Sequence, residues 1–203
     1  MISIVITTYG ADHWKEVATK RAIPSAKAQN AYEVIYWHDP VNEIGPARNT
    51  AAEQATGEWL LFLDADDELA EGYVEAMTGA ICDPRRPEPA MLQPAVRYWR
   101  KGRPMNPTMI PIKDLRVDNF LVIGTVVRRS LFTRVGGFND YPHGFEDWSL
   151  WAKCWKAGAQ VFPVPKAIYD AHVNPQSKHR QMWRDRDYQV RTHLRIQHEL
   201  FPE

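Results

Sequence analysis

The segment that most limits the fold is residues 58–67, where a strongly apolar run ends abruptly in acidic residues. Glu58 is followed by Trp-Leu-Leu-Phe-Leu63, and aspartates occupy positions 64, 66 and 67. A short apolar run of this kind is typical of a strand that is buried on both faces of a parallel sheet. The sequence therefore predicts a central strand whose carboxyl end carries a group of carboxylates.

Strands and helices alternate through the first half of the chain. The β-branched run 2–8 and the run 33–37 predict two further strands. Helices are predicted over 13–29 with a break or kink at Pro24, over 45–55, and over 71–81. This alternation is typical of a parallel α/β sheet with right-handed crossovers, and 203 residues suit one domain.

The second half predicts a smaller addition to that sheet. Residues 90–99 and 105–112 are expected to be strands around a turn at 100–103, forming an antiparallel appendage. Residues 119–127 are β-rich, and short helices are expected over 129–135 and 146–157. We expect a single domain over 1–203 with a first half (1–83), a second half (84–175) and a helical tail (176–203), and a surface helix over about 178–200.

Composition narrows the possible environments. Cys82 and Cys154 form no metal-binding or disulfide pattern, so a reducing compartment is the default. No apolar stretch approaches the ~20 residues that span a bilayer, so we expect a cytoplasmic protein without an integral membrane segment. The zero net charge argues against a protein that grips nucleic acid along a long track.

Charge is nevertheless distributed unevenly. Residues 1–83 contain five Lys or Arg and fourteen Asp or Glu, whereas residues 85–116 contain eight and two. An acidic half would suit a divalent cation and a basic segment would suit an anionic partner. The alternative is that these are solvated faces that happen to differ.

The aspartates at 64, 66 and 67 repel one another, which is tolerated most readily where a cation binds. Carboxylate oxygens suit Mg²⁺ or Mn²⁺ bound to a diphosphate. Locally, the alternative is that Asp66 or Asp67 only caps the following helix.

Several motifs occur in an order that resembles the family 2 glycosyltransferases of GT-A fold. The nucleotide-diphospho-sugar transferases with this Rossmann-like fold share an Ala-Arg-Asn helix and a Gly that lead into an aspartate-tipped strand. Matching pieces cover most of residues 1–175. They are Val-Ile-Thr-Thr-Tyr9, Ser25 and Gln29, Gly45-Pro-Ala-Arg-Asn49, Gly57 to Asp67, Arg128 to Phe138, Glu146-Asp147 and His172.

The resemblance implies that residues 1–83 are a nucleotide-sugar-binding half, with the donor site at the strand ends, and that residues 84–175 are an acceptor and catalytic half. It implies nucleotide contacts from Thr8, Tyr9 and Asp39, and a metal held by Asp64 and Asp66 with His172 completing the shell. Arg48 could neutralise the diphosphate, and its alternative is pairing with Glu53 or Glu58 on the helix surface.

The resemblance also implies the reaction. Asp147 is similar to the catalytic base of an inverting transfer, which takes the proton of the acceptor hydroxyl. Its alternative, with Glu146, is favourable placement of carboxylates in the first turn of a helix. Acceptor-side candidates are Glu146, Trp148, Tyr98, Trp99 and Arg100, although the tryptophans suit a core equally well.

The sequence departs from the family pattern at one place, and two rival functions remain open. Only residues 40–44 separate Asp39 from the Ala47-Arg48-Asn49 helix, where relatives usually have another helix and strand, so donor identity is uncertain. The rivals are a non-catalytic nucleotide-sugar-binding module and a sugar nucleotidyltransferase; the latter predicts a glycine-rich loop after the first strand, where only Gly10 occurs. The acceptor could be a glycan, a protein or a modified nucleic acid.

Overall fold

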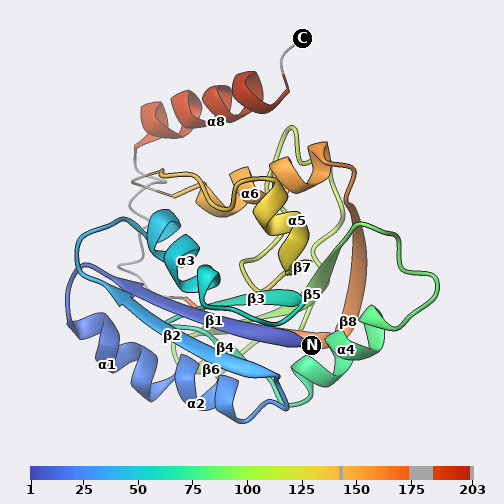
Figure 1. The fold of residues 1–203 in the computed structure, drawn as a ribbon. Coiled ribbons are helices and arrows are strands. Elements are labelled where there is room, and N and C mark those ends of the chain that lie inside the picture. The colour runs from blue at the N-terminus through green and yellow to red at the C-terminus, as the bar shows by residue number, and fades with distance from the viewer. Residues whose placement is uncertain (142–143, 174–184, 202–203) are drawn as a thin grey trace.

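A single mixed sheet forms the centre of the computed structural model, which describes residues 1–141, 144–173 and 185–201 (Figure 1). The strand order is β2-β1-β3-β7-β5-β8-β4, and β6 pairs with the end of β5. The strands are β1 Ile2–Tyr9, β2 Glu33–Asp39, β3 Trp59–Asp64, β4 Glu68–Leu69, β5 Ala90–Arg100, β6 Arg103–Pro104, β7 Val126–Arg128 and β8 Gln160–His172.

Most of these strands run in one direction. β1 is parallel to both β2 and β3, and β5 is parallel to β8. The short strand β7 is antiparallel to β3 on one side and to β5 on the other, so β5 and β8 run in the same direction as β1. The mainly parallel central sheet is therefore confirmed.

Helices cover both faces of the sheet. Figure 1 shows α1, α2 and α4 on one side and α3, α5 and α6 on the other, with α8 beyond α6. Both faces of β1 and β3 are consequently buried, as their apolar sequences require. The helices are α1 His13–Lys20, α2 Ala22–Lys27, α3 Ile44–Glu53, α4 Tyr73–Ile81, α5 Arg129–Arg134, α6 Glu146–Lys156 and α8 Arg186–Leu200.

The sheet curls so that its far edge returns to the end of β3. β4 begins only four residues after Asp64, a distance that an extended chain covers in at most about 14 Å. In the strand order, however, β4 is the outermost strand and pairs with β8 through Glu68 and Asp170. The curl therefore brings the carboxyl end of β8, with His172, beside the aspartates that follow β3.

The antiparallel appendage is present in part: the chain turns back at 100–103, where β6 pairs antiparallel with β5. Residues 90–100 form β5 inside the main sheet, between β7 and β8, and only β6 and a single bridge from Val96 to Thr108 extend it. Residues 105–112 do not form a strand, and only 126–128 of the expected β-rich segment does. Strand β8 is an addition that the sequence had not indicated.

The helix break predicted at Pro24 is present, three residues before the proline. The helix expected over 13–29 divides at Arg21, which has φ −132° and ψ −77°. Pro24 lacks an amide hydrogen and would clash with the carbonyl four residues earlier, so the regular helix ends there. The expected tail helix is present as α8, and residues 178–184 of that prediction lie outside the described ranges.

Candidate active site

The first three strands bring the predicted donor-site residues to one edge of the sheet. In the parallel pairing, Thr7 lies beside Asp64 and Tyr9 lies beside Asp39. Ligands of such sheets bind beyond the carboxyl ends of the strands. The convergence expected of these strand ends is therefore present, although their individual roles are separate questions.

Asp39 and Thr8 are already engaged within the protein. The Asp39 carboxylate accepts hydrogen bonds from the amides of Val41 and Asn42 at 3.0 and 2.9 Å, and from the Asn42 side chain at 2.8 Å. These bonds, with the Asn42 amide first, lower the pKa of Asp39. The Thr8 hydroxyl lies 3.0 Å from the Tyr36 hydroxyl and 2.9 Å from His38 Nδ1. Asp39 thus closes the short turn that replaces the missing helix and strand.

Arg48 connects the aspartate run to the helix that carries Asp147. Its guanidinium is buried and donates to Asp64 Oδ1 at 2.5 Å and to Glu146 Oε1 at 2.7 Å. Burial acts to lower the pKa of Arg48, but the charges of Asp64 and Glu146 outweigh it and raise that pKa. Its carboxylate partners are therefore Asp64 and Glu146, not Glu53 or Glu58, which were the alternative partners suggested by helix spacing.

The neighbouring Asn49 fixes the loop before α6. Its side-chain amide donates to the Phe138 carbonyl at 2.9 Å and accepts from the Phe138 amide at 2.8 Å, as a strand backbone would. The loop can approach this closely because residue 137 is glycine: a Cβ there would lie 2.4 Å from Asn49 Oδ1. Arg48 and Asn49 together hold α6 and the loop before it against α3.

Gly137→Ala is expected to destabilise the fold by about 1–3 kcal/mol more than Gly136→Ala, because it displaces Asn49. The two glycines form a matched pair, since φ is +61° at Gly137 and +78° at Gly136, where an added Cβ meets nothing within 4 Å. Urea unfolding of both variants measures the difference. Equal losses would mean that only the left-handed backbone, and not the Asn49 contact, matters.

The aspartates that follow β3 are crowded and partly buried. Burial, and then the charge of Asp64, raises the pKa of Asp66 to about 6. Burial and the charges of Asp66 and Asp64 raise the pKa of Asp67 well above its ordinary value. Asp67 nevertheless accepts hydrogen bonds from the His172 amide at 2.8 Å and the Tyr169 hydroxyl at 2.9 Å. Asp64 and Asp67 are thus both held by hydrogen bonds from within the protein, Asp64 by Arg48 and Asp67 by His172 and Tyr169.

Polar residues at the break between α1 and α2, in α2, and just after α2 hold the chain that follows the aspartates. Arg21 donates to the Asp66 carbonyl at 2.7 Å. The Gln29 amide donates to the Ala70 carbonyl at 3.1 Å, and the Leu69 amide donates to the Ser25 hydroxyl at 3.3 Å. Ser25 and Gln29 therefore act by holding the β3–α4 connection in place.

His172 lies near the aspartate run but points its ring to other partners. Its Nε2 is 2.6 Å from Glu68 Oε2, and its ring stacks on Trp99 with centroids 5.2 Å apart. Within the described ranges, no three His, Cys, Asp or Glu side chains are arranged to hold a metal ion. The predicted trio of Asp64, Asp66 and His172 is thus not assembled as one ligand set.

A pocket of about 750 Å³ opens beside Asp66. Helix α1 and the hairpin of β5 and β6 form its walls, and the end of β8 closes it. Aromatic and basic side chains line it, including Trp14, Trp99, Arg21, Lys101 and His172. Planar and anionic ligands suit such a lining.

Asp147 lies at the start of α6, half-buried. It accepts hydrogen bonds from the Asn119 amide at 3.0 Å and from the Trp148 backbone at 2.7 Å. Burial, followed by the charge of Glu146, raises the pKa of Asp147 to about 7. The preceding Phe145 has φ +76°, a costly backbone conformation of the kind that clusters at functional sites.

The acceptor-side candidates separate into two groups. Trp148 is 1% exposed and donates to the Leu115 carbonyl at 2.8 Å, so of its two alternatives, acceptor contact and core residue, the structure favours the core. Glu146 is buried against Arg48. Tyr98, Trp99 and Arg100 lie instead at the end of β5, near His172.

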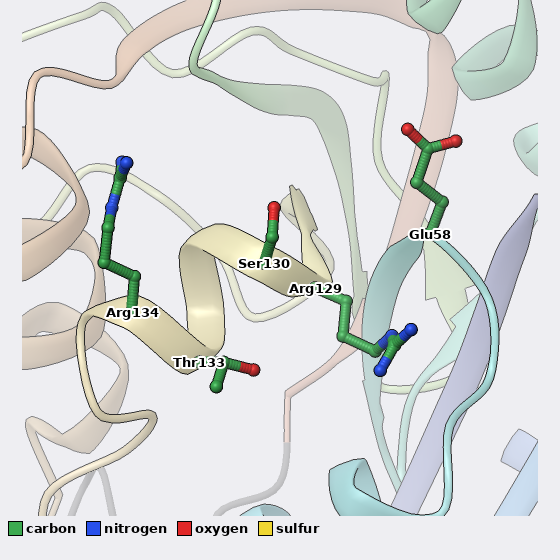
Figure 2. A pocket seen from close by; sticks show the side chains of 5 residues that line it. All are labelled: Glu58, Arg129, Ser130, Thr133 and Arg134. Carbon is green, nitrogen blue, oxygen red and sulfur yellow. The ribbon is translucent and has the colours of Figure 1, made fainter.

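A second pocket of about 430 Å³ lies beside α5, at the amino end of β3 and so away from the aspartate run. Its lining residues are Glu58, Arg129, Ser130, Thr133 and Arg134. Figure 2 shows that the Arg129 and Arg134 side chains point away from each other. These groups do not converge on one ligand.

Sequence reasoning missed Asn119, which contacts Asp147, and Asp170, which orders the end of β5. Asp170 is 4% exposed and accepts two hydrogen bonds from Arg97, at 2.5 and 2.7 Å, and one from Trp99 at 2.7 Å. Neither residue belongs to a recognisable motif. Had β8 been predicted as a parallel partner of β5, Asp170 could have been placed beside Arg97, because directly paired residues of neighbouring strands lie on the same face.

Comparison with known proteins gives a consistent picture. The model of the family described as Glycosyl transferase family 2 matches residues 18–87, which include the aspartate run but not Asp147 or His172. Pre-mycofactocin glycosyltransferases from two Mycobacterium tuberculosis strains are 30% identical over 147 residues, covering 64% of this chain. The chain spans only 30% of the length of these relatives.

Solved structures of S. aureus TarS share the fold. TarS 1-349 in complex with UDP-GlcNAc has a TM-score of 0.67 at 18% identity, covering 87% of this chain and 60% of that one. TarS 1-349 in complex with UDP has a TM-score of 0.65 at 18% identity, covering 98% and 70%. In the described ranges, no helix combines the length and apolar character needed to cross a bilayer. The fold and these matches together confirm the resemblance of this chain to the family 2 glycosyltransferases of GT-A fold.

Proposed function

We propose that this chain is an inverting glycosyltransferase that moves a sugar from a nucleoside-diphosphate sugar to an acceptor hydroxyl. The observation that carries the proposal is the buried Arg48 bridge, because it joins Asp64 of the aspartate run to Glu146, the neighbour of Asp147. The donor end and the candidate base thus belong to one charged cluster. The matches to glycosyltransferases, and the UDP and UDP-GlcNAc complexes of TarS, support a nucleotide-sugar donor.

In the proposed reaction, Asp147 takes the proton from the acceptor hydroxyl. The acceptor oxygen forms a bond to the anomeric carbon, and the bond from that carbon to the diphosphate oxygen breaks, which releases the nucleoside diphosphate. The pKa of about 7 suits a base that works at neutral pH, since the group is partly ionised and still basic. Asn119 and the Trp148 amide orient the carboxylate.

We further propose that Asp64 and Asp66 hold Mg²⁺ or Mn²⁺. The donor set fits, because hard cations prefer carboxylate oxygens and commonly complete their shell with substrate phosphates and water. A bound cation would stabilise the negative charge on the leaving diphosphate. Tyr9 and Thr8 remain candidates for the nucleotide, while Asp39 would have to serve both its turn and the ligand.

The proposal is tested by incubating the protein with a panel of nucleotide sugars and Mn²⁺ and measuring the released nucleoside diphosphate. We expect slow hydrolysis or transfer with one donor class, lost in EDTA and in Asp66→Asn. Asp118→Asn is the control, because that aspartate is exposed and pairs with Lys113. Metal-independent binding without nucleotide release would instead support a binding module.

A further inference from the structure

The Lys and Arg residues of the basic segment 85–116 form two groups, those paired with a carboxylate and those without such a partner. Five of its eight Lys and Arg have a carboxylate partner within 2.8 Å: Arg85, Arg86, Arg97, Lys113 and Arg116. The other three, Arg100, Lys101 and Arg103, form no ion pair with the described residues. Outside the described ranges, residues 142–143 and 174–184 contain no Asp or Glu by sequence, and Glu203 is the one acidic residue. The unpaired charge is therefore concentrated at one place, the tip of the β5–β6 hairpin.

Two features of this hairpin are energetically unfavourable. Lys101 and Gly102 are its two turn residues, with φ +50° and +72°, as in a type I′ turn. Asn, Asp or Gly usually occupies the first turn position, so a lysine there is unfavourable. Arg100 and Arg103 are directly paired across the hairpin, and like charges in that position repel. An anion bound at the tip would relieve the repulsion.

One face of the hairpin is turned toward the aspartate run. Alternate residues of a strand share a face, so Arg100 lies on the same face as Tyr98 and Val96. Val96 pairs with Tyr169 of β8, whose hydroxyl donates to Asp67. The opposite face carries Trp99, which lines the pocket beside Asp66 together with Lys101. Lys101 thus lies at the pocket beside Asp66, and Arg100 and Arg103 flank the turn that carries it.

We propose that Arg100 and Arg103, with Lys101 at the turn, form a phosphate-binding hairpin beside the active site. Two guanidinium groups on one face suit phosphate oxygens, because each can donate two parallel hydrogen bonds. This deepens the glycosyltransferase proposal and rests on it for the source of the phosphate. That source is either the donor diphosphate or a phosphate carried by the acceptor. Three unpaired cations in a neutral chain are too few for a nucleic-acid track.

The test is calorimetric titration, at low salt, of the wild type and of Arg100→Gln/Arg103→Gln with three probes: inorganic pyrophosphate, UDP, and glucose 6-phosphate. Loss of two charge-assisted contacts is expected to weaken binding about 10- to 100-fold and to flatten its decline with salt. Weaker binding of pyrophosphate and UDP assigns the hairpin to the donor. Weaker binding of glucose 6-phosphate alone assigns it to the acceptor.

Two further variants protect the result from indirect effects. Lys113→Gln/Arg116→Gln removes the same charge from cations that already have carboxylate partners, so it should bind all three probes as the wild type does. Lys101→Asn should raise thermal stability, because Asn-Gly favours this turn, and yet weaken phosphate binding. Unchanged affinity for every probe in the arginine variant, or an equal loss in the lysine–arginine control, would overturn the proposal. Hairpin-dependent pyrophosphate binding in a protein that turns over no nucleotide sugar would uphold the hairpin site while refuting the transferase.

Discussion

Asp147→Asn is expected to lower kcat by about 10²- to 10⁴-fold, the usual range for losing a general base. The amide cannot accept the acceptor proton, but it keeps the size of the carboxylate and can still bond to the Trp148 amide. Binding of the nucleotide sugar should persist, because the aspartate run is intact. In the wild type, activity should rise with pH through about 7 and then level, since only ionised Asp147 is a base. Initial rates across pH, with donor binding measured separately, provide the check.

The same variant has a stability signature. Because folding raises the pKa of Asp147 from 3.8 to about 7, the folded state binds an extra proton between these values, and stability falls as pH rises through that window. Asp147→Asn has no such penalty. The melting temperature of the variant minus that of the wild type should therefore increase as the pH is raised from 5 to 8. Asp140→Asn, an exposed site in the preceding loop, should show neither effect. Full turnover by Asp147→Asn would refute the assigned base.

The first half of the fold was predictable because its signals are local. The runs that became β1, β2 and β3 are apolar and bounded by turn or helix residues, and Pro24 announces the break in its helix. Strand β8 escaped prediction because Pro163 and Pro165 lie inside it, and proline cannot donate to a strand ladder. The structure accommodates them where the pairing with β5 jumps from Val164–Pro94 to Ile168–Ala95. The sequence alone does not indicate that β5 is the strand with which β8 pairs.

For the candidate site, the sequence predicted only that residues at the carboxyl ends of the parallel strands lie at one edge of the sheet. Asp64 and the strand-end residues of β1 and β2 lie at one edge because parallel strands must place them there. The partners of Arg48 could not be foreseen, since Glu146 lies 98 residues away and helix spacing suggested nearer glutamates. Trp148 shows the same limit, because the sequence alone does not distinguish a buried tryptophan from an exposed one.

Arg48→Met is expected to destabilise the fold by about 3–5 kcal/mol, the cost of leaving a buried charge without its partner. At roughly 2–4 °C per kcal/mol for a chain of this size, the melting temperature should fall by about 6–20 °C. Glu146 is 8% exposed and loses its counter-charge, whereas Asp64 is more open to solvent. Methionine can fill the space of the Arg48 side chain beside the Phe138 ring, although it loses the cation–π contact there, so the loss reflects charge more than volume.

Arg48→Met/Glu146→Gln should recover part of that loss, because glutamine removes the stranded charge. A double-mutant cycle measured by urea unfolding in EDTA gives the coupling free energy directly. Arg85→Met is the matched control: Arg85 pairs with Asp83 on the surface, where such pairs contribute about 0–1 kcal/mol. If Arg48→Met melted like the Arg85 variant, the bridge would not hold α6 to the aspartate strand. The geometric link between the donor end and Asp147 would then lose its energetic basis.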